Sequence, residues 1–154
     1  MKKTERKIAV AVLAVMMFSA LATTAYASHA NLSFENVYIS FADFCGIGLV
    51  GDKDNDTPLY VEIDNKNIAR TYKVRALGCT ITGDQRVNLT YDGTDLCAYA
   101  VCNVGVDYSI QSLIYERGYG YATVELCACG PSCDTSGKWS PDSVETHNNP
   151  NTVS

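Results

Sequence analysis

The chain has 154 residues, of which 47% are hydrophobic, and a formal net charge of −5 at pH 7. This acidic balance excludes a protein that binds the phosphate backbone of nucleic acid, because such binding requires clustered Lys and Arg. It also argues against electrostatic adhesion to anionic surfaces, and the length suits one domain with a modest core.

The N-terminus has the pattern of a secretory signal peptide. Basic residues among positions 2–7 precede an apolar run at 8–22, and Ala25-Tyr26-Ala27 has the small-x-small form of a cleavage site. The apolar run of about 15 residues is shorter than the ~20 that span a bilayer. We therefore predict a signal peptide at 1–27 and a secreted, extracellular protein without stable membrane insertion after cleavage, with a retained anchor helix as the less favoured alternative. Cleavage would leave 8 basic and 16 acidic residues, a net charge of −8.

Alternating apolar and polar residues predict strands along the rest of the chain. In residues 34–44, Val37, Ile39 and Phe41 are expected on one face, and Asn36, Tyr38 and Ser40 on the other. Gly-, Asp- and Asn-rich turns separate this run from further strand candidates at 59–63, 69–77, 87–91, 96–106, 119–129 and 136–140. Short strands that are separated by turns about every ten residues are typical of an antiparallel sandwich or barrel. We predict an all-β fold, an antiparallel β-sandwich of about seven strands.

Two segments are less regular. Residues 107–117 fit either a short helix or a strand, and the neighbouring strands favour the second. Residues 143–154 are polar and rich in Asn, which predicts a flexible tail. The expected organisation is a signal peptide at 1–27, one β-sandwich domain at 28–142 and a flexible polar tail at 143–154.

Seven cysteines follow the predicted cleavage site. In an oxidising compartment they favour disulfide cross-links, up to three, over a structural zinc site. No C-x-x-C pair is present, which argues against redox catalysis. An odd number leaves one thiol over, and the pattern does not choose the pairing. The candidates are Cys45, Cys79, Cys97, Cys102, Cys127, Cys129 and Cys133.

An acidic loop is the one candidate metal site. Asp52, Asp54 and Asp56 have the D-x-D-x-D spacing with which a calcium loop begins. The EF-hand positions for Gly and Glu hold Thr57 and Ile63 instead, so the loop is no EF-hand. A solvated connection between strands is the favoured interpretation, weak calcium binding is the alternative, and no other cofactor is expected.

The sequence predicts a protein that is not an enzyme. Its histidines, His29 and His147, lie near the predicted cleavage site and in the polar tail, where we expect no defined geometry for a catalytic base. Tyr115, Tyr119 and Tyr121 form the main surface candidate, since exposed aromatic rows bind sugars or proteins. Side chains that simply cover a face of a sheet are the favoured alternative interpretation.

The C-terminal part resembles a known group of proteins. Pro58-Leu59-Tyr60, and a G-x-W-S-P-D-S segment from Gly137 to Ser143, resemble small secreted proteins of unknown function from Gram-positive bacteria, which are distantly similar to lactococcin-type bacteriocins. The resemblance implies a secreted β fold and supplies no catalytic residues. The expected function is a secreted, non-enzymatic module that binds an unknown protein or cell-envelope partner, or acts as a bacteriocin-like factor. The alternatives are a weak calcium-binding structural protein and an extracellular hydrolase.

Overall fold

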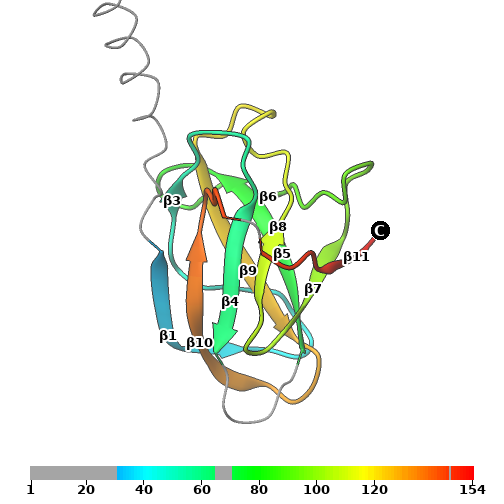
Figure 1. Ribbon diagram of the computed structural model, residues 1–154. Helices are drawn as coiled ribbons and strands as arrows, with labels where there is room; N and C mark the ends of the chain where they lie inside the picture. Colours follow the sequence, from blue (N-terminus) through cyan, green and yellow to red (C-terminus); the bar gives the residue numbers. More distant parts are fainter. Residues whose placement is uncertain (1–30, 65–70, 146) are drawn as a thin grey trace, which may run out of the picture.

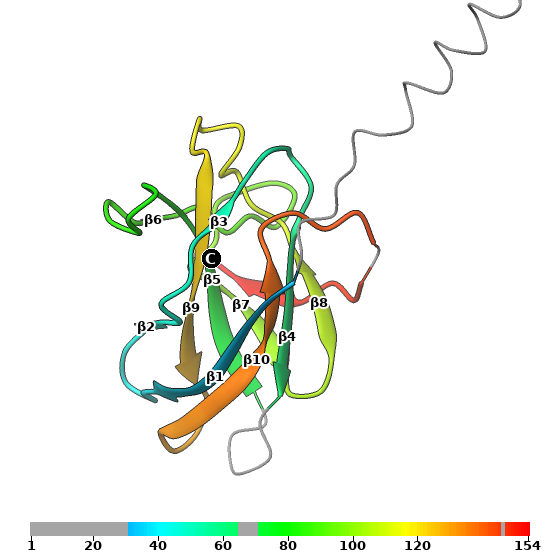
Figure 2. The same cartoon turned by 90° about the vertical axis from the view of Figure 1, so that its left-hand side faces the viewer.

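The computed structural model describes residues 31–64, 71–145 and 147–154. The predicted signal peptide lies outside these residues. The described chain forms two β-sheets that face each other across a common core (Figures 1 and 2). None of the described residues forms a helix with the length and hydropathy of a membrane span.

The first sheet has four strands, and each neighbouring pair is antiparallel. In spatial order these are β1 (Leu32–Ile39), β10 (Cys133–Ser140), β4 (Leu59–Asp64) and β8 (Asp107–Ile110).

The second sheet is larger, and its strand pairs are also antiparallel. Its main path is β11 (Asn151–Val153), β7 (Tyr99–Asn103), β5 (Thr71–Cys79), β9 (Tyr121–Ala128) and β2 (Cys45–Gly46). Two short strands lie off this path: β3 (Gly51–Asp52) pairs with β9, and β6 (Val87–Asn88) pairs with β5. The predicted all-β antiparallel fold is confirmed, with more and shorter strands than the expected seven.

Alternation along the central strands produces the core, because successive side chains of a strand point to opposite faces. The even-numbered residues of β5 from Tyr72 to Ala76 are buried, as the pattern predicts. The Tyr72 hydroxyl reaches across the core from the second sheet and lies 2.6 Å from Thr135 Oγ1 of β10. Trp139 of β10 is fully buried in the same core.

The first strand differs from its predicted pattern. The pairing of β1 with β10 shifts register between Phe34 and Val37, and Asn36 there has a φ of 52°. The Asn36 N–H donates to Ser136 Oγ at 3.2 Å. The strand then ends at Ile39, so Phe41, expected inside, is 65% exposed. A bulge followed by an early strand end breaks the period of two on which the prediction rested.

The two irregular segments also take definite positions. Residues 107–110 form β8, as the favoured interpretation expected, and the chain then runs through turns up to residue 120. Residues 143–145 and 147–154, which belong to the predicted flexible tail, lie against the sandwich, and their last part forms β11, which pairs with β7. β7 would otherwise be an edge strand, and its backbone N–H and C=O groups can pair with a polar segment of almost any sequence. The composition of residues 143–154 therefore does not reveal that they add a strand.

Candidate functional site

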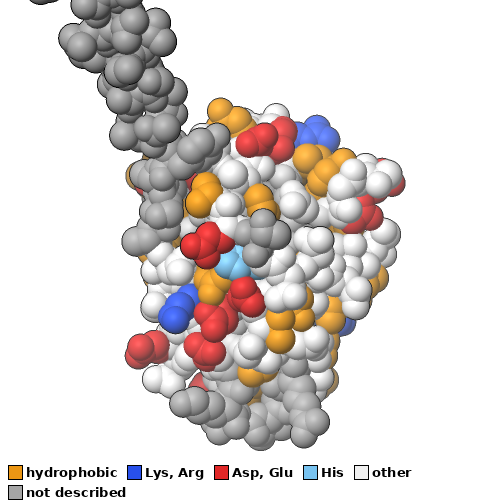
Figure 3. Space-filling view, viewed as in Figure 1, with side chains coloured by type: hydrophobic (Ala, Val, Ile, Leu, Met, Phe, Trp, Pro, Cys, Tyr) orange, Lys and Arg blue, Asp and Glu red, His pale blue; other side chains and the backbone are white. Residues whose placement is uncertain are grey.

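A hollow of about 450 Å³ lies where the C-terminal segment crosses the outer face of the first sheet. Its walls come from the residues before β4, from β8 and its end, and from the C-terminal segment. Figure 3 shows this face: the histidine lies at the surface, with acidic side chains on several sides of it. We regard this hollow as the candidate functional site.

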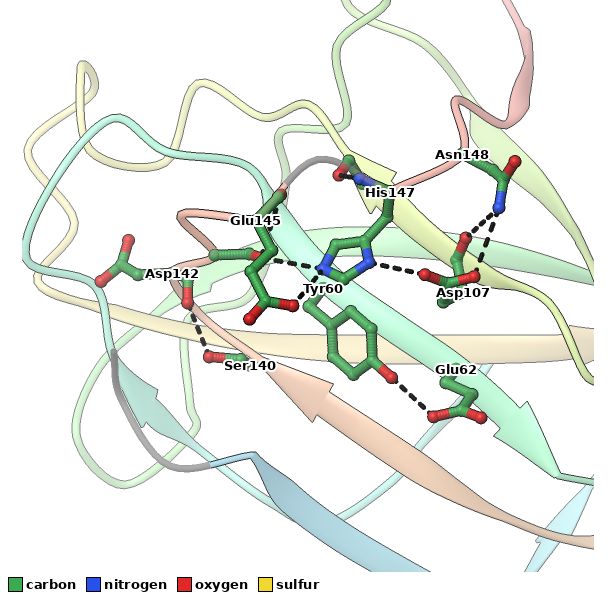
Figure 4. Close-up of polar contacts among 10 residues, drawn as sticks. Tyr60, Glu62, Asp107, Ser140, Asp142, Glu145, His147 and Asn148 are labelled. Atoms are coloured by element: carbon green, nitrogen blue, oxygen red, sulfur yellow. Dashed lines mark hydrogen bonds and ion pairs between the residues drawn. The ribbon is translucent and has the colours of Figure 1, made fainter. Parts of the chain in front are cut away.

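His147 is the centre of the polar contacts at the hollow (Figure 4). Its Nδ1 lies 2.6 Å from Asp107 Oδ2, and its Nε2 lies 3.2 Å from Ser143 Oγ. The Glu145 carboxylate is 4.0 Å from the same Nε2. Because a carboxylate only accepts hydrogen bonds, Asp107 selects the form of the ring that carries a proton on Nδ1.

The backbone of the C-terminal segment holds His147 in place. The His147 N–H donates to Ser109 Oγ at 3.2 Å. The next residue, Asn148, forms a parallel bridge with Tyr108 of β8, and its side chain donates to the Asp107 carbonyl at 3.1 Å. The expectation that His147 has no defined geometry therefore does not fit the structure, in which its side chain is only 11% exposed.

The imidazole ring of His147 packs against the ring of Tyr60. The Tyr60 and His147 rings lie 4.6 Å apart between centroids, with an interplanar angle of 49°. The Tyr60 hydroxyl donates to Glu62 Oε2 at 2.6 Å. Tyr60 and Glu62 both point to the outer face of β4, so the register of one strand brings the ring and the carboxylate to the same place.

Several carboxylates lie close together at this site. Glu62 of β4 and Asp107 of β8 are directly opposite each other. Two like charges in this position repel each other and destabilise the pair of strands. Burial raises the pKa of Tyr60, and so do its hydrogen bond to Glu62 and the negative charges of Glu62, Asp107 and Asp64. Lys138 of β10 is opposite Glu62 on the other side, at an exposed position. The site is therefore suited to a positively charged group.

The pKa of Asp107 is lowered, first by the hydrogen bond to His147 and next by its own backbone. A lowered folded-state pKa contributes stability that is present above the unfolded value and lost as the pH falls through the folded one. We expect Asp107→Asn to lower the melting temperature by a constant amount above about pH 5, and by progressively less below about pH 4. Thermal denaturation of both proteins across this range measures the difference.

The control for this measurement is Asp134→Asn, which removes an exposed carboxylate of β10. Its melting temperature should follow that of the wild type at every pH. A pH-independent effect of Asp107→Asn would contradict the assigned role of the carboxylate.

The Ser143, His147 and Asp107 contacts have the connectivity of a nucleophile, a base and an orienting acid. Two features differ from those of an acyl-transfer site. The Ser143 N–H, which in an acyl-transfer site would point at the oxyanion, donates to the Pro58 carbonyl at 2.9 Å. The Asp107 side chain is also 45% exposed.

Two aspartates of the predicted calcium loop take part in the contacts of the sandwich. Within residues 31–64, 71–145 and 147–154, no three His, Cys, Asp or Glu side chains form a group that could hold a metal ion. Asp52 belongs to β3, and the Asp54 N–H donates to Asp142 Oδ2 at 2.9 Å. Weak calcium binding stays a prediction, for which the melting temperature with calcium and with chelator is the test.

The three tyrosines do not form one exposed row. Tyr115 is 48% exposed, in the turns that follow β8. Tyr119 packs against the core and over Gly78, where an added Cβ would lie 2.6 Å from the tyrosine ring. Tyr121, at the start of β9, lines a separate hollow of about 320 Å³. Their predicted role as a binding surface stays a prediction.

The structure holds all seven cysteines as thiols, so it assigns no pairing and the cross-links remain a prediction. Cys102 faces the core beside Tyr72, and burial raises its pKa to about 12. Cys133 Sγ lies 3.1 Å from the Tyr72 hydroxyl. Cys127 donates to the Phe41 carbonyl at 3.4 Å, and burial raises its pKa as well. Cys129 is exposed.

These environments predict an order of thiol reactivity. At neutral pH we expect an alkylating reagent to modify Cys129 first and Cys102 last, because the thiolate is the reactive form and burial disfavours it. Peptide mapping after timed alkylation of the native protein measures the order, and a reduced, denatured sample shows full labelling. Equal rates at the two positions would contradict the burial of Cys102.

Sequence reasoning missed Asp107 and Ser143 as partners of His147. The only local signal is the S-x-x-x-H spacing from 143 to 147, which is not specific. Asp107 is 40 residues away and joins the site through the bridge between β8 and the C-terminal segment.

Comparisons with known proteins place the chain in a family. No curated protein and no solved structure matches the chain significantly. The profile of DUF2712, described as a protein of unknown function, matches residues 50–143. The chain therefore belongs to the DUF2712 family.

Proposed function

We propose that this member of the DUF2712 family is a secreted, non-enzymatic module that binds a cationic group of a protein or cell-envelope partner. The observation that supports the proposal is the hollow at His147. Glu145 lines it, and the carboxylates of Glu62 and Asp107 lie beside the Tyr60–His147 ring pair. Lysine and arginine side chains are the cationic groups that such a partner would present.

The charges at the rim favour a cation over a neutral ligand. The Glu145 side chain lines the hollow and is 81% exposed, so a ligand reaches it without displacing protein. A cation between Glu145 and Asp107 would also relieve the repulsion between Asp107 and Glu62. Such a partner would be attracted over a distance, because the chain after signal cleavage is strongly acidic.

The test is a titration of the exported protein with a lysine-rich peptide, followed by calorimetry or by NMR shifts of His147. We expect binding that weakens as salt is added. The Glu62→Gln/Glu145→Gln double variant neutralises the carboxylate that lines the hollow and the one that accepts from Tyr60 beside it. It should bind at least about tenfold more weakly, a loss of about 1.4 kcal/mol.

The matched control is Glu116→Gln combined with Asp134→Asn, which removes two charges at exposed positions outside the hollow. This control should bind like the wild type. A glutamate-rich peptide should not bind. Equal weakening in both double variants would show that only net charge matters and would remove the hollow from the proposal.

A finer version of this function is a bacteriocin-like activity. Growth inhibition of neighbouring bacterial strains by the purified protein is its direct test, and the same double variant should lose the inhibition. Inhibition that survives in the variant would separate that activity from the hollow.

A second candidate function is hydrolysis, favoured by the 3.2 Å contact between His147 Nε2 and Ser143 Oγ. In that reaction Ser143 would attack an ester or amide and His147 would accept its proton. Labelling with a fluorophosphonate, located by peptide mapping, decides between the candidates. Modification of Ser143 that disappears in His147→Gln would support hydrolysis, and an unlabelled Ser143 would remove it.

A further inference from the structure

A lysine and an aspartate are in contact at the buried end of the acidic loop, away from His147. The Lys53 Nζ lies 2.5 Å from Asp142 Oδ1, and it donates to the Thr57 carbonyl at 2.5 Å. The side chains of Lys53 and Asp142 are only 1% and 3% exposed. Lysine and aspartate are rarely buried to this degree.

Both side chains are held by their surroundings. The Lys53 N–H donates to the Gly120 carbonyl at 3.0 Å, which fixes the backbone beside β9. Asp142 Oδ2 accepts from the Asp54 N–H at 2.9 Å, and the Asp142 carbonyl accepts from Ser140 Oγ at 2.7 Å (Figure 4). The amine and the carboxyl carbon are therefore kept next to each other in a place that excludes water.

We propose that Lys53 and Asp142 condense into an intramolecular isopeptide bond. A proton passes from the Lys53 ammonium to the Asp142 carboxylate across their contact, which leaves a neutral amine and a carboxylic acid. The Nζ lone pair then attacks Asp142 Cγ and forms the C–N bond. The second proton leaves nitrogen, the Cγ–O bond breaks, and the oxygen departs with both protons as water. No oxidant or other co-reactant is consumed.

Two physical factors favour this reaction at this place. Burial makes a separated pair of charges costly, whereas the amide product carries no charge. Fixed neighbours also react as if they were at very high concentration, with effective molarities that reach about 10⁵–10⁸ M. The Thr57 hydroxyl donates to Asn55 Oδ1 at 2.5 Å and also lies 3.3 Å from Asp142 Oδ1, which helps to hold the carboxyl group in place.

The bond would join the two sheets covalently. Lys53 follows β3, which pairs with β9 of the second sheet, and Asp142 follows β10 of the first sheet. It would also anchor the start of the C-terminal segment that contains Ser143 and His147. This cross-link uses no cysteine, so it is independent of the predicted disulfides.

Intact mass spectrometry of the exported, fully reduced protein tests the proposal. We expect a mass about 18 Da below that of the sequence after signal cleavage, because one water is lost. Lys53→Arg should have its full mass, whereas Lys138→Arg, the same change at an exposed lysine, should keep the loss. Digestion should also release a branched peptide that joins positions 53 and 142.

Other outcomes would overturn the proposal. A wild-type protein with its full mass contains no such bond. A loss of about 18 Da that persists in Lys53→Arg comes from another dehydration, such as a succinimide at an aspartate. Because Lys53→Arg could fail to fold, the branched peptide of the wild type is the decisive measurement, and its absence alone would refute the bond.

Discussion

Replacing Lys53 with methionine is expected to lower the free energy of unfolding by about 3–5 kcal/mol. The substitution keeps an unbranched side chain of nearly the same length but removes the Lys53 nitrogen. It leaves the Asp142 carboxylate in its buried place with neither the Lys53 ammonium nor the proposed amide bond. A buried charge that loses its cation costs far more than a surface ion pair contributes. Urea denaturation followed by the fluorescence of the only tryptophan, Trp139, measures the change.

Two further variants control this prediction. Lys138→Met, at an exposed position, should stay within about 0.5 kcal/mol of the wild type. The double variant Lys53→Met/Asp142→Leu should regain most of the lost stability if the partners are held only as ions, because no uncompensated charge then remains. A double variant as unstable as the single one would indicate that the stabilisation comes from a covalent cross-link.

Replacing Trp139 with alanine is expected to cost about 3–5 kcal/mol. Trp139 has no exposed surface and is the largest fully buried side chain of the described core. It faces Val61 on β4 and Leu32 on β1, so its removal leaves a cavity where three strands meet. Denaturation followed by far-UV circular dichroism measures the loss, since the alanine variant has no tryptophan.

The conservative variant Trp139→Phe separates packing from hydrogen bonding. Within the described residues, the Trp139 Nε1 has no hydrogen-bond partner. Phenylalanine should therefore cost clearly less than alanine, because it fills much of the cavity and gives up no hydrogen bond. Equal losses for the two variants would mean that the indole N–H makes a contact that stabilises the core.

The outer face of the first sheet and the end of the acidic loop have different roles in these proposals. The His147 hollow is partly open, acidic and suited to recognising a cation. The Lys53–Asp142 contact is closed to solvent and suited to holding the two sheets together. The two meet at consecutive residues, Asp142 and Ser143, so a change at the cross-link would be expected to affect the C-terminal segment as well.

Much of the sandwich was predictable from local patterns. The alternation in β4 and β5 determines which side chains face the core, because the period of two is a property of the strand itself. The same rule was wrong at Phe41, where a bulge at Asn36 and the end of β1 interrupt the period. Strands shorter than three residues, such as β2 and β6, carry too few alternations to be recognised.

By itself the sequence determined the fold class, the acidic charge and the candidate signal peptide, since each depends on composition or on residues close in the chain. Only the tertiary structure decided which polar side chains meet. Lys53 and Asp142 are 89 residues apart, and His147 and Asp107 are 40 apart. Such contacts depend on the pairing of strands and on the path of the C-terminal segment over β8. The backbone hydrogen bonds that fix this pairing and this path form with almost any side chains, so the sequence does not reveal them.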